Sequence, residues 1–128
     1  MREVLHQLNR TKGVLGSLLT APDGLLIAAE LNNRYDRDEV AALSAGIGLT
    51  VSAWLERFRA AGRTLVVLDT SAVRLFVSAV RWGFLVVMAD KSASTGAIRL
   101  DLKAAVTRLD HIRLLSPDAG TEETRAGD

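Results

Sequence analysis

Two glycines in the motif Gly46-Ile47-Gly48 come nearest, in type and spacing, to a known chemical site. A dinucleotide-binding loop has the pattern G-x-G-x-x-G after a strand, because its glycines let the backbone approach a pyrophosphate. Here Val51 occupies the third glycine position, and the motif lies inside a predicted helix. The phosphate-loop pattern G-x-x-x-x-G-K-[S/T] does not occur in the sequence. We therefore interpret these glycines as packing residues and not as a nucleotide site.

Other residues that could do chemistry are few and scattered. The two histidines, His6 and His111, lie in different predicted helices, and the chain has no cysteine. Lone histidines without cysteine or carboxylate partners are more often surface residues than metal ligands. Asp23, Asp69 and Asp90 fall at predicted turns or strand ends, where aspartate commonly bonds the local backbone. No G-x-S-x-G nucleophile motif is present. The sequence thus predicts no catalytic residue, metal ligand or cofactor, and no enzyme.

The composition of the chain argues against nucleic acids and membranes as binding partners. The chain has 128 residues, which favours one domain, with 16 basic and 15 acidic side chains and a net charge of +1. This balance, with only 5% aromatic residues, argues against nucleic-acid binding. The uncharged stretch 40–55 is shorter than the roughly 20 residues needed to cross a bilayer. Residues 1–12 lack the apolar segment of a signal peptide, so we expect a cytoplasmic protein without membrane insertion.

The elements that must position any site follow from hydrophobic periodicity and turn residues. Helical spacing predicts helices over 2–12, 36–61 and 96–114, with Gly13 and Gly62 as stops and Asp36 as an N-cap. Apolar runs separated by turn residues predict strands over 14–21, 25–30, 64–70, 73–80 and 83–90. The order α-β-β-α-β-β-β-α predicts a three-layer α/β/α sandwich with a five-stranded antiparallel sheet. Residues 116–128 have no apolar anchor, so we expect a domain over 1–115 and a disordered tail.

The long predicted helix has two uncharged faces. Its large side chains recur at helical spacing, and we expect this stripe to pack on the sheet: Val40, Leu43, Ile47, Val51, Trp54 and Phe58. The opposite face consists mainly of small residues, including Gly46 and Gly48, each costing about 1 kcal/mol of helix stability relative to alanine. Close approach of a second helix would offset that cost. The alternative is that this face is exposed alanine and glycine without a partner.

The strand predicted at 64–70 contains no proline or lysine that would protect an open edge. Pairing with a second copy about a two-fold axis would satisfy that edge and cover the small helix face. We therefore predict a homodimer. Its predicted interface residues are Ala41, Ala45, Gly48, Leu49, Ser52, Leu65 and Val67.

The order and spacing of four segments resemble the Roadblock / dynein light chain family over about residues 3–112. These segments are GVLGSLLTAPDGLLIA (13–28), DRDEVAALSAGIGLTVSAWL (36–55), VRLFVSAVRWGFLVVMAD (73–90) and TGAIRLDLKAAVTRL (95–109). Gly13, Gly16, Asp23 and Gly24 match the family's opening G-x-x-G…D-G motif, and Gly83 matches the turn before its last strand.

The resemblance implies a noncatalytic platform that dimerises through the long helix and the following strand. It also implies, for the bacterial members, regulation of a Ras-like small GTPase. Mixed charges at the two helix ends suit specific protein docking. The candidate docking residues are Arg34, Tyr35, Arg37, Glu56, Arg57 and Arg59. A small-ligand sensor is the alternative function, because related sandwiches hold ligands between sheet and helix.

Overall fold

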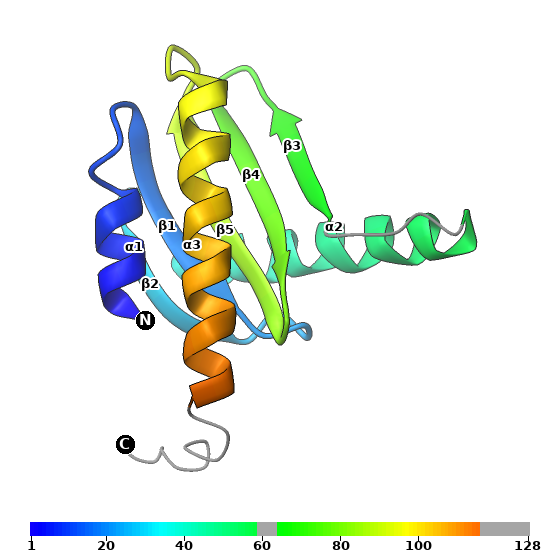
Figure 1. Ribbon diagram of the computed structural model, residues 1–128. Coiled ribbons are helices and arrows are strands. Elements are labelled where there is room, and N and C mark those ends of the chain that lie inside the picture. Colours follow the sequence, from blue (N-terminus) through cyan, green and yellow to red (C-terminus); the bar gives the residue numbers. More distant parts are fainter. Residues whose placement is uncertain (59–63, 116–128) are drawn as a thin grey trace.

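The computed structural model describes residues 1–58 and 64–115 (Figure 1), with side chains described as far as His111. Its elements follow the predicted order. They are α1 (Arg2–Leu8), β1 (Val14–Thr20), β2 (Leu26–Leu31), α2 (Arg37–Arg57), β3 (Leu65–Asp69), β4 (Val73–Val80), β5 (Gly83–Asp90) and α3 (Thr95–Leu115). Two helices are shorter than predicted, because α1 ends at Leu8 and α2 at Arg57. Gly62, Arg59 and the predicted tail 116–128 lie outside the described residues.

All five strands form one antiparallel sheet in the order β2-β1-β5-β4-β3. The central strand β5 is apolar on both faces and is buried from Gly83 to Ala89. The equally apolar β3 is instead an edge strand, and its residues 67–69 are exposed. An apolar run therefore marked a covered strand in one case and an uncovered one in the other.

Two glycines, Gly13 and Gly24, have the positive φ angles that their sequence context predicts. Gly24 has φ +94° in the turn between β1 and β2, where its N–H donates to the Ala21 carbonyl at 2.9 Å. The Asp23 carboxylate accepts the Leu25 N–H at 3.0 Å, which closes the same turn. Gly13 has φ +91° at the start of β1, and not at the end of α1, where Asn9 forms a right-handed cap. Glycine adopts positive φ without the steric cost that other residues carry.

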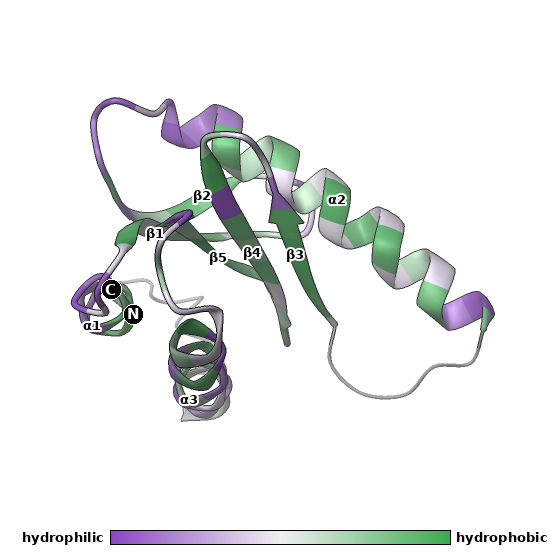
Figure 2. Ribbon diagram, turned by 90° about the horizontal axis from the view of Figure 1, so that it is seen from above, coloured by the Kyte–Doolittle hydropathy of each residue, from purple (hydrophilic) through white to green (hydrophobic). Residues whose placement is uncertain are grey.

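The helices form two layers around the sheet. On one face α1 and α3 enclose a core that includes Leu5, Phe76 and Leu102. Trp82, in the turn before β5, is half-buried against this core and so folds back onto the domain. On the other face α2 covers the sheet and runs across the strands (Figures 1 and 2). It contacts β1, β2, β4 and β5.

The predicted assignment of the two faces of α2 holds at Val40, which packs against the core beneath the helix, and is wrong for the exposed large residues. The residues of α2 that are buried on the sheet are Ala41, Ser44, Ala45 and Gly48, which are the small ones. The large side chains of Leu43, Trp54 and Phe58 are exposed by 58%, 56% and 70%. Small residues face the sheet because they let the helix backbone lie close to the strands. A Cβ at Gly48 would overlap the Phe84 ring of β5, whereas a Cβ at Gly46 would meet no atom within 4 Å.

The length of α2 explains the rest of its exposure. A helix of 21 residues is about 32 Å long. Five strands span only about 19 Å from the first axis to the last. The N-terminal half of α2 lies on the sheet, and its C-terminal half projects beyond the edge at β3 (Figure 1). No helix among the described residues is long and apolar enough to cross a membrane.

Candidate interaction surface

The outer side of α2 carries an apolar surface that no part of the described chain covers. Leu43, Leu49, Trp54 and Phe58 are its large exposed side chains. Ala42, Gly46, Thr50 and Ala53 lie exposed between them, and Ile47 and Val51 are half-buried. We call these ten residues the α2 stripe. An apolar surface without charge is typical of a protein–protein contact, because its burial releases water from hydrocarbon.

The overhanging end of α2 is shaped by its aromatic residues. From Leu49 to Phe58 no residue is buried. The Trp54 and Phe58 rings, one helical turn apart, have centroids 5.8 Å apart with planes tilted by 30°. The Arg57 guanidinium carbon lies 5.8 Å from the Trp54 ring centroid, a cation–π geometry. This end is therefore a large amphipathic contact surface with one cation on it.

Strand β3 borders the side on which α2 overhangs. It pairs only with β4 among the described strands, so its outer backbone groups have no strand partner there. Val67 is 36% exposed and Leu68 39% exposed. An open edge strand is a template for pairing with another chain. The α2 stripe and the open β3 edge therefore present apolar and backbone-bonding groups toward the same side of the molecule (Figure 2).

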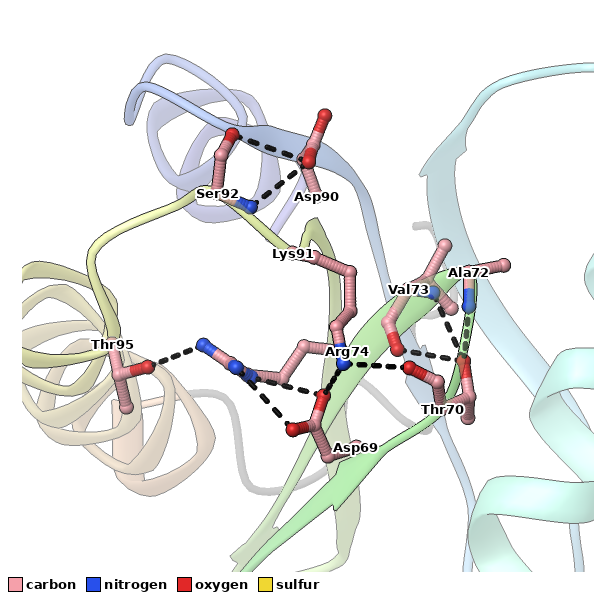
Figure 3. Close-up of polar contacts among 9 residues, drawn as sticks. All are labelled: Asp69, Thr70, Ala72, Val73, Arg74, Asp90, Lys91, Ser92 and Thr95. Carbon is pink, nitrogen blue, oxygen red and sulfur yellow. Dashed lines mark hydrogen bonds and ion pairs between the residues drawn. The ribbon is translucent and has the colours of Figure 1, made fainter.

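A polar network fixes the far end of β3 (Figure 3). The Lys91 ammonium donates to Asp69 Oδ1 at 2.6 Å and to the Thr70 carbonyl at 2.8 Å. The Arg74 guanidinium donates to Asp69 at 3.4 Å and to Thr95 Oγ1 at 2.8 Å. Hydrogen bonds from Lys91 and then Arg74 lower the pKa of the Asp69 carboxyl below its ordinary value. These contacts tie β3 to β4, β5 and α3, so the edge is held in place.

The neighbouring turns are closed by their own side chains. The Thr70 hydroxyl accepts the Val73 N–H at 2.9 Å and donates to the Val73 carbonyl at 2.7 Å. The Asp90 carboxylate accepts the Ser92 N–H at 2.9 Å, and this bond lowers its pKa. Asp69 and Asp90 thus act as structural groups at strand ends, in agreement with their sequence context.

The predicted interface residues divide into two groups. Ala41, Ala45 and Gly48 are buried against the sheet of their own chain and do not lie on the exposed side of α2. Leu49 is 47% exposed and lies on the α2 stripe. Ser52 and Leu65 are half-buried and Val67 is exposed near the overhang, so these three remain candidates with Leu49.

The predicted docking residues lie at opposite ends of α2. Arg34 and Arg37 are exposed near its start, and Glu56 and Arg57 are exposed near its end. Tyr35 is half-buried against the core beneath α2. Arg59 lies outside the described residues. One protomer does not bring the two ends together, because a 21-residue helix separates them.

Sequence reasoning missed the large stripe as a contact surface. It placed Leu43, Trp54 and Phe58 on the sheet, because large apolar residues usually form the core. The available signal was length, because the large apolar residues recur from residue 40 to residue 58, farther than a five-stranded sheet is wide. Within the described residues no group of three or more histidine, cysteine or acidic side chains could hold a metal ion.

Comparisons with known proteins agree with this architecture. The model of the Roadblock/LC7 domain matches residues 1–89. An uncharacterized protein of Methanocaldococcus jannaschii, MJ0310, is 32% identical over 107 residues, which cover 83% of this chain and 93% of that protein.

Solved structures show the same fold. A Roadblock/LC7 domain from Streptomyces avermitilis has a TM-score of 0.81 at 20% identity, covering 89% of this chain and 98% of the other. MglB of Myxococcus xanthus has a TM-score of 0.79 at 22% identity, covering 86% and 91%. The gliding protein MglB of Thermus thermophilus has a TM-score of 0.75 at 26% identity, covering 87% and 86%. From its family match and this shared fold, the chain belongs to the Roadblock/LC7 domain family.

Proposed function

We propose that this protein is a homodimeric, noncatalytic platform in the cytoplasm that binds and regulates a Ras-like small GTPase. The observation that supports the proposal most is the uncovered α2 stripe, with Leu43, Leu49, Trp54 and Phe58 exposed on one side of one helix. A stable monomer rarely leaves such a surface in water.

A second copy related by a two-fold axis fits this surface. Two α2 stripes facing each other would bury the large side chains of both helices, and the overhanging ends would extend over the partner. The open β3 edges would pair so that the two sheets continue into each other. A standard stable interface buries about 1,200–2,000 Å² in total, and a helix pair with a strand pair supplies an area of this order.

Docking of the GTPase is proposed on the charged ends of paired α2 helices. In an antiparallel pair, Arg34 and Arg37 of one copy come beside Glu56 and Arg57 of the other. The result is a surface of mixed charge, which sets the orientation of a protein partner. Family membership supports a regulatory partner, and structural neighbours include a gliding protein, MglB.

Analytical ultracentrifugation of the full chain tests the dimer. We expect a dimer at micromolar concentration and a monomer for Trp54→Glu, because a charge there would be buried without a partner. Far-UV circular dichroism checks that this variant stays folded. A monomeric wild type at this concentration would contradict the proposal.

Calorimetric titration with a candidate Ras-like GTPase, loaded with GDP or with a nonhydrolysable GTP analogue, tests docking. We expect Arg57→Glu with Arg59→Glu to weaken binding at least about tenfold and to leave the dimer intact. The control is Arg108→Glu, an exposed arginine of α3 on the far face of the sheet. Equal affinity for both variants and wild type would place the docking surface elsewhere. A small molecule released on denaturation would instead support the ligand-sensor alternative.

A further inference from the structure

The residues that the structure describes leave part of one sheet face, the face that carries α1 and α3, without a helix over it. A helix is about 10 Å wide and strands lie about 4.8 Å apart, so each helix covers about two strands. α1 contacts β1 and β2, and α3 contacts β4. In Figure 1 the side of β4 and β3 that lies beyond α3 has no helix over it.

A groove lies along this margin between α3 and the edge of the sheet. Leu65 of β3 and Ser78 of β4, which are partners in the strand register, form one side. Leu102 and Val106 of α3 form the other side and belong to the core. Leu100 also lines the groove and is 71% exposed. The groove is therefore mainly apolar, and its mouth holds a large side chain in water.

The charge beside the groove has one sign. Arg99 and Lys103 line it from α3, four residues apart and so on the same side of the helix. No acidic side chain lines it within the described part of the chain. Two acids of α3 are engaged elsewhere, because Asp101 accepts a hydrogen bond from Thr11 and Asp110 accepts the Arg81 N–H. Among the described residues neither the Arg99 nor the Lys103 side chain forms an ion pair, and both residues are exposed.

We infer that this groove binds an amphipathic helix of a partner protein, with leucine-like side chains on one face and acidic residues flanking them. The apolar face would lie against Leu65, Leu102 and Val106 and would cover Leu100. Its carboxylates would meet Arg99 and Lys103. The groove follows α3 from Gly96 to Thr107, about 16 Å, which suits three helical turns. The groove lies on the face opposite α2, so it is separate from the α2 stripe and from the proposed GTPase docking. It shares Leu65 with β3, the strand whose open edge is proposed to pair in the dimer.

The probe is a fluorescein-labelled synthetic peptide of about 15 residues, with leucines at i, i+3, i+4 and i+7 spacing and glutamates flanking them. A matched peptide carries lysines in place of the glutamates. In fluorescence anisotropy with the full chain, we expect saturable binding of the acidic peptide only. Arg99→Glu with Lys103→Glu should weaken it at least about tenfold. Leu100→Glu should weaken it at least about fivefold, and Trp54→Glu should leave it unchanged.

Several results would overturn the inference. They are no binding of the acidic peptide, equal binding of the lysine peptide, or unchanged affinity of the Leu100→Glu variant. Loss of a higher oligomer in Leu100→Glu would show that a second copy occupies the groove. Markedly tighter peptide binding after deletion of residues 116–128 would show that the chain's own C-terminal segment does. Neither result would argue against the proposed α2 dimer, because Trp54→Glu tests that dimer separately.

Discussion

Helices α2 and α3 are both 21 residues long, yet they bury different kinds of side chain against the sheet. α3 turns Ile98, Leu102 and Leu109 to the sheet, and exposes Arg99, Asp101, Lys103 and Arg108. The residues of α2 that are fully buried on the sheet are small, and the helix exposes Leu43, Leu49 and Trp54. Among the described residues, most large apolar side chains of α3 are buried within one protomer, whereas several of α2 stay exposed. The difference shows that apolar content does not identify the side of a helix that its own chain covers.

The two helices also sit on the sheet in different ways. In Figure 1 α3 runs along the strands and lies over the sheet for most of its length, while α2 crosses the strands and extends past the sheet edge at β3. Crossing brings the backbone of α2 close to several strands at once, which requires small residues such as Gly48 above Phe84. The same crossing carries Trp54 and Phe58 past the edge. Close packing at one end and overhang at the other are thus two results of one orientation.

The largest difference is expected between two separate variants, each with a leucine replaced by glutamate, one in α2 and one in α3. Leu49→Glu should weaken the proposed dimer at least about thirtyfold, since truncating a central interface residue costs about 2 kcal/mol or more. Leu100→Glu should leave the dimer unchanged, because Leu100 lies on the opposite face of the sheet. Sedimentation equilibrium over a range of concentrations measures both. Equal effects of the two variants would mean that the α2 stripe is not the dimer contact.

The next effect concerns the close approach of α2 to β5. Gly48→Ala should lower the free energy of unfolding by about 1–2 kcal/mol, because overpacking against the buried Phe84 ring costs about 1–3 kcal/mol and improved helix propensity offsets part of it. Urea unfolding monitored by circular dichroism measures the change. An unchanged or higher stability would show that the Phe84 ring moves aside without cost.

Gly46→Ala is the matched control within the same helix and should act in the opposite direction. A Cβ there meets no atom within 4 Å, so the helix gains up to about 1 kcal/mol. The measurement belongs in the monomeric Leu49→Glu background, where no second copy covers Gly46. If the gain appears there but not in wild type, Gly46 lies inside the dimer. A loss of stability in the monomer would contradict the exposed position of Gly46.

The smallest effect is expected at the end of β3. The pKa of Asp69 in the folded chain lies below its ordinary value of 3.8, since Lys91 and Arg74 donate to the carboxylate. Its stabilising contribution is therefore complete above pH 3.8 and fades as the pH falls from 3.8 through the lower folded value. Asp69→Asn should be slightly less stable than wild type at pH 6, and the gap should close below this window. Thermal melts at several pH values, with and without 0.5 M salt as a screening control, measure it.

Much of this fold could be predicted from the sequence. Hydrophobic periodicity and the turn residues around Gly24 predicted the order of the elements, the hairpin and the antiparallel sheet, all of which the structure confirms. The N-cap at Asp36 is also confirmed, since its carboxylate accepts the N–H groups of Asp38 and Glu39. These features depend on local geometry, which a few neighbouring residues determine. The lack of charge along residues 40–55 likewise indicates a contact element, because it is a property of the sequence alone.

Only the tertiary structure decided which side of that helix is the contact. Along α2 the small face and the large face are both apolar, so helical periodicity is satisfied whichever face turns inward. The choice depends on how closely the helix lies over β5 and on where the sheet ends, and neither distance is encoded locally. The groove beside α3 is similar, because it exists only where Leu65 of β3 meets Leu102 of α3 across a long sequence separation. Local patterns determine elements, whereas the surfaces left uncovered depend on how those elements are packed.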